Sequence, residues 1–205
     1  MKCSPLDLIF LFRHLPYLMI MKQKAAERFL DMQIQEGIEL QYMLEAYPQV
    51  HYAPLEFYYI CLKGVSILDE DVISDLTQHY SWRGILIAGW LSILYPSEAF
   101  YPILDKVLPI TPEPNLWIVE LALAEIRKIP FKDKVLQQKF FRFRDLLHTA
   151  KYEKASVRKL PFPDLAPEEK KHTDELRSIC RKEGVKAARQ HMSDSPFWKL
   201  FMDPL

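Results

Sequence analysis

Glycine and cysteine are both scarce in this chain of 205 residues, which has five glycines and three cysteines. So few glycines argue against folds built on glycine-rich turns, such as nucleotide-binding βαβ units and many-stranded sandwiches. The cysteines, Cys3, Cys61 and Cys180, are odd in number and far apart, a pattern that indicates neither a disulfide framework nor a zinc site. We therefore expect a protein of the reducing cytoplasm.

The sequence also lacks an uninterrupted apolar run long enough to span a membrane. The apolar N-terminal stretch from Leu8 to Met21 is broken by Arg13, His14 and Pro16, and no small-residue cleavage site follows it. The sequence therefore predicts a soluble protein that does not associate with a membrane.

Proline, in contrast, is frequent, and most of the fifteen prolines separate apolar segments of helical period. Proline lacks the amide hydrogen and clashes with the preceding turn, so it begins and ends helices. The pattern predicts an all-α fold, an irregular HEAT-like stack of antiparallel helical hairpins. We expect a helical-repeat-like body over residues 1–157, a Pro-rich linker over 158–167, and a C-terminal helical appendage over 168–205 that docks on the body.

The most apolar stretch, Ser81 to Leu104, is the predicted centre of the core. Ser81 is the expected N-cap of a helix that runs nearly to Pro96, and its apolar residues continue around the whole helix, as enclosure by other helices requires. Earlier in the chain, Gly37 is expected to interrupt a helical pattern. A helix is favoured over a β-strand near Phe57 because a proline precedes the segment and a glycine follows it.

The net charge of zero conceals an asymmetry along the chain. Residues 1–126 have 8 Lys+Arg against 16 Asp+Glu, a net charge of −8, and residues 127–205 have 19 against 11, a net charge of +8. Folding could neutralise the two halves internally, or each half could attract partners of the opposite charge.

An acidic group next to the central stretch is the candidate partner-binding site. One interpretation is purely structural: these acids cap a helix and keep it soluble, since acids in a first turn complement the helix dipole. The alternative is an acidic face for a basic partner protein, with tyrosines at helix ends as anchors. The candidate partner-binding residues are Asp69, Glu70, Asp71, Asp75, Glu98, Tyr80 and Tyr101.

Other chemistry finds less support in the sequence. Lys139 to Arg144 mixes basic and aromatic residues as nucleic-acid-binding segments do, but the helical period places Phe140 and Phe143 in the core. This alternative, an RNA- or DNA-binding helical module, would use Arg142, Arg144, Lys151, Lys154, Arg158 and Lys159.

Catalytic and metal-binding motifs are the remaining possibilities, and we predict neither. Asp145 and His148 have the i,i+3 spacing of a helical metal site, as do His172 and Glu175, but further ligands are not evident, so solvated pairs are expected. Cys61 is interpreted as a small core residue rather than a nucleophile. We expect no catalytic residues, no metal, no cofactor and no small-molecule substrate.

The central stretch resembles a group of known proteins. The pattern carrying the resemblance is Asp71-Val-Ile-Ser-Asp75-Leu, then Trp82-Arg83-Gly84 opening a helix with Ala88 and Trp90, then Phe100, Ile103 and Leu104. Over roughly residues 55–127 it is similar to all-helical immunity proteins of bacterial contact-dependent inhibition and polymorphic-toxin systems.

The resemblance implies a stoichiometric inhibitor, not an enzyme, that binds a cognate toxin domain and blocks its action. Many such toxins are nucleases with basic surfaces, so the acidic part of this chain would be the contact side. For Arg83 we expect a structural salt bridge inside the helical stack rather than a partner contact.

Overall fold

The computed structural model describes residues 8–9, 12, 22–39, 53–149 and 166–198. Within these ranges every regular element is helical and no strand occurs, so the all-α prediction is confirmed for this part of the chain. The predicted linker over 158–167 lies outside the described residues, apart from its last two positions, which begin a helix.

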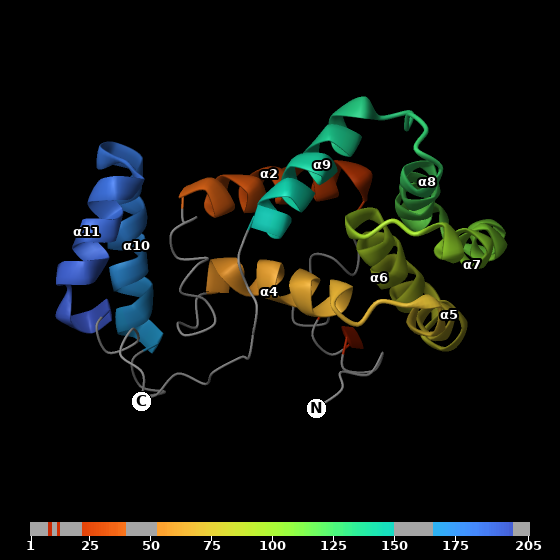
Figure 1. Cartoon of the computed structure of the whole chain (residues 1–205), viewed down its shortest axis with the longest axis horizontal. Helices are drawn as coiled ribbons and strands as arrows, with labels where there is room; N and C mark the ends of the chain where they lie inside the picture. The colour runs from red at the N-terminus through yellow and green to blue at the C-terminus, as the bar shows by residue number, and fades with distance from the viewer. Residues whose placement is uncertain (1–7, 10–11, 13–21, 40–52, 150–165, 199–205) are drawn as a thin grey trace. The chain divides into compact units, whose positions relative to one another are not determined.

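From α4 to α9 the described helices follow one another with short connections (Figure 1). In chain order they are α2 (Gln23–Glu39), α4 (Ala53–Val65), α5 (Glu70–His79), α6 (Ser81–Leu94), η2 (Glu98–Phe100), α7 (Tyr101–Val107), η3 (Leu108–Ile110), α8 (Glu113–Arg127), α9 (Lys134–Thr149), α10 (Ala166–Glu183) and α11 (Val185–Asp194), where η denotes a 3-10 helix.

The chain divides into two compact units. Unit 1 comprises Met1–Met32 and Ile60–Leu147, and unit 2 comprises Gln33–Tyr59 and His148–Leu205. Helices α5 to α8 therefore belong wholly to unit 1, whereas α10 and α11 belong to unit 2 and pack against each other.

Helix α6 forms the centre of unit 1, packed against α5 and α8 (Figure 1). Every residue from Gly84 to Leu94 is buried, in line with an apolar surface that continues around the helix. Gly89 permits the close approach of α8, because a Cβ atom at this position would lie 2.9 Å from Cγ1 of Ile118. The stretch that the sequence places at the core is thus a core helix.

Three aromatic rings join α6 to α8 and α9. Trp90 lies 4.7 Å from Phe140 and 6.3 Å from Trp117, measured between ring centroids, and the Trp90 and Trp117 rings meet edge to face. Such pairs stabilise a core beyond their buried area. Phe140 and Phe143 are both buried, which confirms their predicted place in the core.

Two predicted helix boundaries are wrong. Ser81 is not the N-cap of α6: Tyr80 occupies that position, and Ser81 is the first helical residue with φ of 55°, an uncommon value for a residue with a Cβ atom. Gly37 does not interrupt α2, and a Cβ atom at this position would collide with the hydroxyl of Tyr58. The segment near Phe57 is helical, as favoured, within α4.

Among the described helices, none is both long enough and apolar enough to span a membrane.

Candidate functional site

The acidic group predicted from the sequence begins at the N-terminus of α5. Asp69 is the N-cap, and its Oδ1 accepts a hydrogen bond of 2.8 Å from the backbone N–H of Val72. The capping interpretation is therefore correct for Asp69. Glu70 and Asp71 follow in the first turn, and both side chains are exposed. Their charges complement the helix dipole and remain available to solvent.

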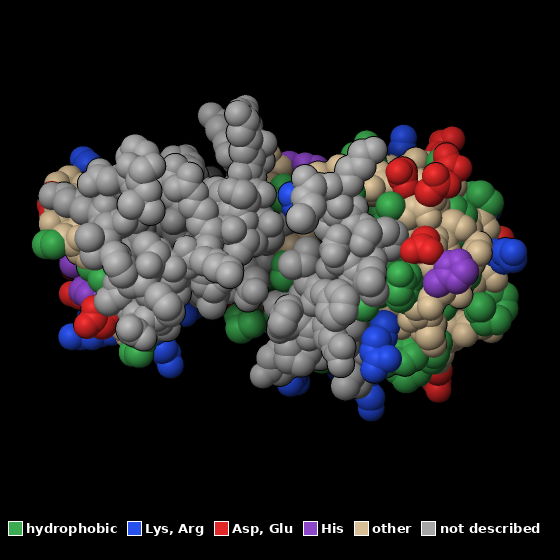
Figure 2. Space-filling model, turned by 90° about the horizontal axis from the view of Figure 1, so that it is seen from below, with side chains coloured by type: hydrophobic (Ala, Val, Ile, Leu, Met, Phe, Trp, Pro, Cys, Tyr) green, Lys and Arg blue, Asp and Glu red, His purple; other side chains and the backbone are tan. Residues whose placement is uncertain are grey.

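The other acidic residues are brought close by the packing of α5 against η2 and α7. Asp75 lies one turn along α5, and its Oδ1 is 3.8 Å from Nε2 of His79. Figure 2 shows acidic side chains grouped over part of unit 1, one of them beside a histidine. We define the acidic surface as the carboxylates of these three elements and the cap, namely Asp69, Glu70, Asp71, Asp75, Glu98 and Asp105.

The two tyrosines of the predicted site have different surroundings. Tyr80 is partly exposed where α5 ends. The Tyr101 ring is held by the guanidinium of Arg127, whose Cζ lies 3.9 Å from the ring centroid, and its hydroxyl donates a hydrogen bond of 3.1 Å to Asp105. Desolvation and the bond to Asp105 raise the pKa of the Tyr101 hydroxyl, against the opposing charge of Arg127. Tyr101 is thus fixed in place at the edge of the acidic surface.

Ion pairs neutralise other acids with bases from the C-terminal half. Within unit 1, Lys139 Nζ lies 2.7 Å from Asp31, and Arg144 contacts Glu125. Within unit 2, Arg177 Nη2 lies 2.5 Å from Glu36 Oε1. Among the residues that the structure describes, no carboxylate of the acidic surface has such a Lys or Arg partner. Within the described ranges the charge asymmetry is therefore cancelled in part, by ion pairs that do not include the acidic surface.

The basic residues of the nucleic-acid alternative are only partly described. Arg142 is exposed, whereas Arg144 is half-buried, with its Nη1 directed at Glu125 and at the carbonyl oxygen of Ile93 inside unit 1. The remaining residues of that set, Lys151, Lys154, Arg158 and Lys159, lie outside the described residues.

The residues considered for metal or nucleophilic chemistry do not form a common site, although His172 Nδ1 lies 3.8 Å from Glu175 Oε2 on α10. Asp145 and His148 are exposed on α9, and in the described ranges no group of three or more His, Cys, Asp or Glu residues is arranged to hold a metal ion. His172 stacks on Phe197 at 4.2 Å between ring centroids. Cys61 is buried, as predicted, and burial raises the pKa of its thiol well above the usual value.

Arg83 differs from its prediction. It is exposed rather than inside the stack, and its Cζ lies 4.6 Å from the ring centroid of Trp82. A cation–π contact at the surface therefore takes the place of the expected buried salt bridge.

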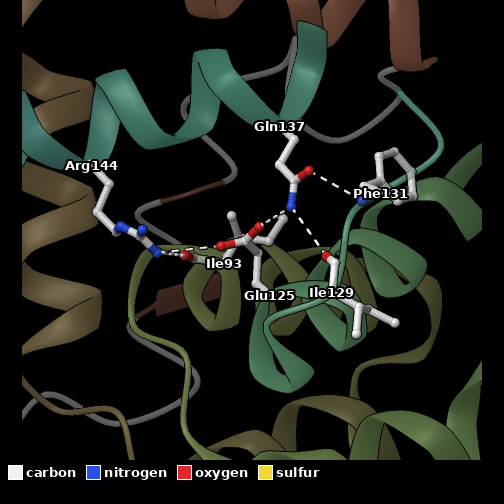
Figure 3. Close-up of polar contacts among 6 residues, drawn as sticks. All are labelled: Ile93, Glu125, Ile129, Phe131, Gln137 and Arg144. Atoms are coloured by element: carbon white, nitrogen blue, oxygen red, sulfur yellow. Dashed lines mark hydrogen bonds and ion pairs between the residues drawn. The ribbon is translucent and has the colours of Figure 1, made fainter. Parts of the chain in front are cut away.

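Sequence reasoning missed a second site, a pocket between α8 and α9. Its floor holds Glu125, which is 7% exposed and receives hydrogen bonds from Gln137 and Arg144 (Figure 3). The available signal was an acidic residue within the apolar run from Leu121 to Ile126, since an ionised side chain in a buried helix needs partners. Those partners lie 12 and 19 residues away, which the spacing could not reveal.

Comparisons of the chain with protein-family models, with curated proteins and with solved structures found no match.

Proposed function

We propose that this chain is a binding protein that neutralises a basic partner protein by covering it with the acidic surface of α5, η2 and α7. The observation that carries the proposal is the distribution of ion pairs. Bases of the C-terminal half pair with acids such as Asp31, Glu36 and Glu125. Among the described residues they leave the acidic surface without an ion pair to Lys or Arg, although Asp69 also caps α5 and Glu70 and Asp71 complement its dipole.

Electrostatics makes such a surface suited to fast and selective association. Carboxylates of one sign on neighbouring elements add their potentials, and a basic protein approaching within about 10 Å at 0.1 M salt experiences their combined field. Charged rim residues increase the association rate, while apolar and aromatic anchors supply most of the affinity. Tyr80 and Tyr101, at the edge of the acidic surface, are the proposed anchors.

The packing beneath the acidic surface supports the proposed binding role. A surface that is already held in place loses little conformational entropy when a partner binds. Helix α5 packs on the buried α6, and a Cβ atom at Gly84 would collide with the carbonyl oxygen of Leu76. We further propose that unit 1 is a HEAT-like stack of antiparallel hairpins, an arrangement supported by the packing of α6 against both α5 and α8.

The resemblance of residues 55–127 to immunity proteins supports a cognate toxin domain, a nuclease in particular, as the basic partner. The chain would then act in the cytoplasm, as a stoichiometric inhibitor rather than an enzyme. A gene for a toxin-bearing protein should lie beside the gene for this chain. A neighbourhood of metabolic genes without a toxin domain would contradict this part of the proposal.

The direct experiment is co-purification with the neighbouring toxin domain, followed by charge reversal on the acidic surface. Asp71→Lys combined with Glu98→Lys changes two exposed acids. We expect the association rate at low salt to fall about tenfold and its salt dependence to weaken.

The matched control is Asp174→Lys combined with Glu183→Lys, which makes the same change of net charge on exposed positions of α10. This control should retain the wild-type association rate. Equal losses in both double variants would show an effect of net charge alone and contradict the acidic surface as the contact. Retention of a mixed RNA pool with steep salt dependence would instead favour the nucleic-acid alternative.

A further inference from the structure

The pocket between α8 and α9 is a cavity of about 510 Å³ within unit 1. This volume lies in the range of small-molecule sites in proteins. It shares no lining residue with the acidic surface. The pocket is therefore a different site from the acidic surface proposed above for partner binding.

A preorganised polar network forms the floor of the pocket. Gln137 Nε2 donates a hydrogen bond of 2.6 Å to Glu125 Oε1 and a longer one of 3.5 Å to the carbonyl oxygen of Ile129. Gln137 Oε1 accepts a bond of 3.1 Å from the backbone N–H of Phe131. Figure 3 shows this side chain between Glu125 and the loop that follows α8. These hydrogen bonds hold the side chains that form the floor of the pocket in one position.

Arg144 is held at the other end of the floor with donors to spare. Its Nη1 lies 3.5 Å from Glu125 Oε2 and 3.4 Å from the carbonyl oxygen of Ile93, both at the long end of hydrogen bonding. The guanidinium also lies over the Phe141 ring, with Cζ 4.9 Å from the centroid. Both hydrogen bonds to described residues use Nη1, so the rest of the planar fork can donate to a bound anion.

The charge of the pocket is positive overall. Three cationic residues line it, namely Lys128, Lys134 and Arg144, and Glu125 is the single carboxylate of the lining. That carboxylate is already engaged by Gln137 and Arg144, and burial raises its pKa against the opposing effect of these two partners. A negatively charged group therefore finds more attraction than repulsion here.

The other wall of the pocket is apolar. Ile129 is 50% exposed, and it lies in the lining with Pro96, Pro130 and Phe141. Covering these side chains would remove apolar surface from water, at about 25 cal/mol per Å². A ligand with an apolar part next to a negatively charged group would complement both the cationic and the apolar side chains of the lining.

We propose that the α8–α9 pocket binds a small organic anion with an apolar body, its charged group on Arg144 and its body on Ile129 and Phe141, with Lys134 adding positive charge to the lining. The ligand would be bound and not converted.

The test is a titration of ¹⁵N-labelled full-length chain with octanoate, which carries both a charge and an apolar body. Acetate supplies the charge without the body, and 1-octanol supplies the body without the charge. We expect saturable shifts of the amide signals of Ile129, Gln137 and Phe141 with octanoate, and affinities at least about tenfold lower for the other two probes. Equal affinity for 1-octanol and octanoate, or shifts spread over the chain without saturation, would overturn the proposal.

Variants at exposed lining positions localise the binding. Gln138→Trp should fill the pocket and abolish the octanoate shifts, and Lys134→Gln should weaken binding about threefold, as expected for one solvent-exposed charge. Lys106→Gln, an exposed lysine of α7 that does not line the pocket, is the matched control and should bind like wild type.

A second pair of variants separates charge from shape, should the tryptophan impair folding. Ile129→Gln and Ile129→Glu have nearly the same size, and only the second adds a negative charge at the apolar wall. Octanoate should bind the glutamate variant at least about fivefold more weakly than the glutamine variant. Equal binding by these two, or unchanged binding by Gln138→Trp, would place the octanoate elsewhere.

Discussion

Gly84 of α6 lies directly against the carbonyl oxygen of Leu76 in α5, so close that no Cβ atom fits between them. The residue is glycine because a backbone atom, which cannot rotate away, occupies the space of a side chain. This contact sets the separation of the helices that carry the acidic surface and the core.

Alanine substitutions at three glycines of unit 1 should therefore have graded effects. Gly84→Ala should destabilise most, by about 3 kcal/mol or more, because helix backbones must separate. Gly89→Ala meets Ile118 at 2.9 Å and should cost less. Gly64→Ala meets only the end of the Leu91 side chain, which can move, and the helix propensity of alanine offsets about 1 kcal/mol.

Urea denaturation of the three variants measures this order. A Gly84→Ala variant as stable as Gly64→Ala would show that α5 and α6 are not in the described contact.

The contact between Gly37 and Tyr58 in unit 2 predicts coupled mutational effects. Tyr58→Phe removes the hydrogen bond of 2.8 Å that the hydroxyl donates to the carbonyl oxygen of Gln33, a loss of about 1 kcal/mol. Gly37→Ala should cost more, because its Cβ atom collides with that hydroxyl.

The double variant should then be more stable than the sum of the single effects implies, since removing the hydroxyl relieves the closest contact of the alanine and leaves the ring carbon Cζ at 2.8 Å. A double-mutant cycle by chemical denaturation measures the coupling. Strict additivity would mean that the two side chains do not share this space.

The buried carboxyl of Glu125 predicts how stability depends on pH. Its pKa in the folded protein is raised, mainly by burial, so the folded state holds the proton more tightly than the unfolded state does. The resulting stabilisation is fully present below the unfolded pKa and is lost as the pH rises through the folded pKa. Glu125→Gln removes this dependence, so its stability relative to wild type should increase as the pH rises from about 4 towards neutrality.

Thermal unfolding at a series of pH values tests this expectation for Glu125. Glu120→Gln is a suitable control, because Glu120 pairs with the exposed Lys132 at the surface. A stability difference between Glu125→Gln and wild type that stays constant across this range would contradict the prediction.

Asp133 should show the opposite pH dependence. Its Oδ1 accepts a bond of 3.0 Å from the backbone N–H of Leu136 and its Oδ2 one of 2.5 Å from Gln23, and the bond from Leu136 leads the effects that lower its pKa. This stabilisation is present above the unfolded pKa and disappears as the pH falls through the folded pKa.

Two substitutions separate the charge of Asp133 from its capping role. Asp133→Asn can still cap α9, so it should be less stable than wild type near neutral pH and similar to it in acid. Asp133→Ala loses the cap and should cost about 1–2 kcal/mol near neutral pH. Circular dichroism melts at both pH values distinguish them, and equal stability of wild type and Asp133→Ala at neutral pH would exclude the capping role.

The parts of the fold that were predictable are those with local causes. Asp69 caps α5 through a backbone N–H three residues away, and Pro102 stands in the first turn of its helix. The predictions that were wrong depend on contacts between residues far apart in the sequence. Gly37 lies within α2, and the space that a side chain would need there is taken by Tyr58, 21 positions further along the chain.

The candidate sites were also predictable only where their causes are local in the sequence. The acidic residues of α5 could be found from their clustering, and their lack of Lys or Arg partners in the described ranges required coordinates. The pocket at Glu125 required the α8–α9 loop to bring Gln137 and Arg144 to it, which depends on how two helices pack.

The amide of Gln137 joins groups from α8, α9 and the loop between them, and this has a kinetic consequence. The N–H of Phe131 lies outside any helix, yet its hydrogen is bonded to a side chain anchored on α9. Exchange of that hydrogen with deuterium requires Gln137 to withdraw, which also releases Glu125 and Ile129. Phe131 should therefore exchange as slowly as the first turns of α9, which makes one loop amide a reporter of the opening of the whole α8–α9 corner.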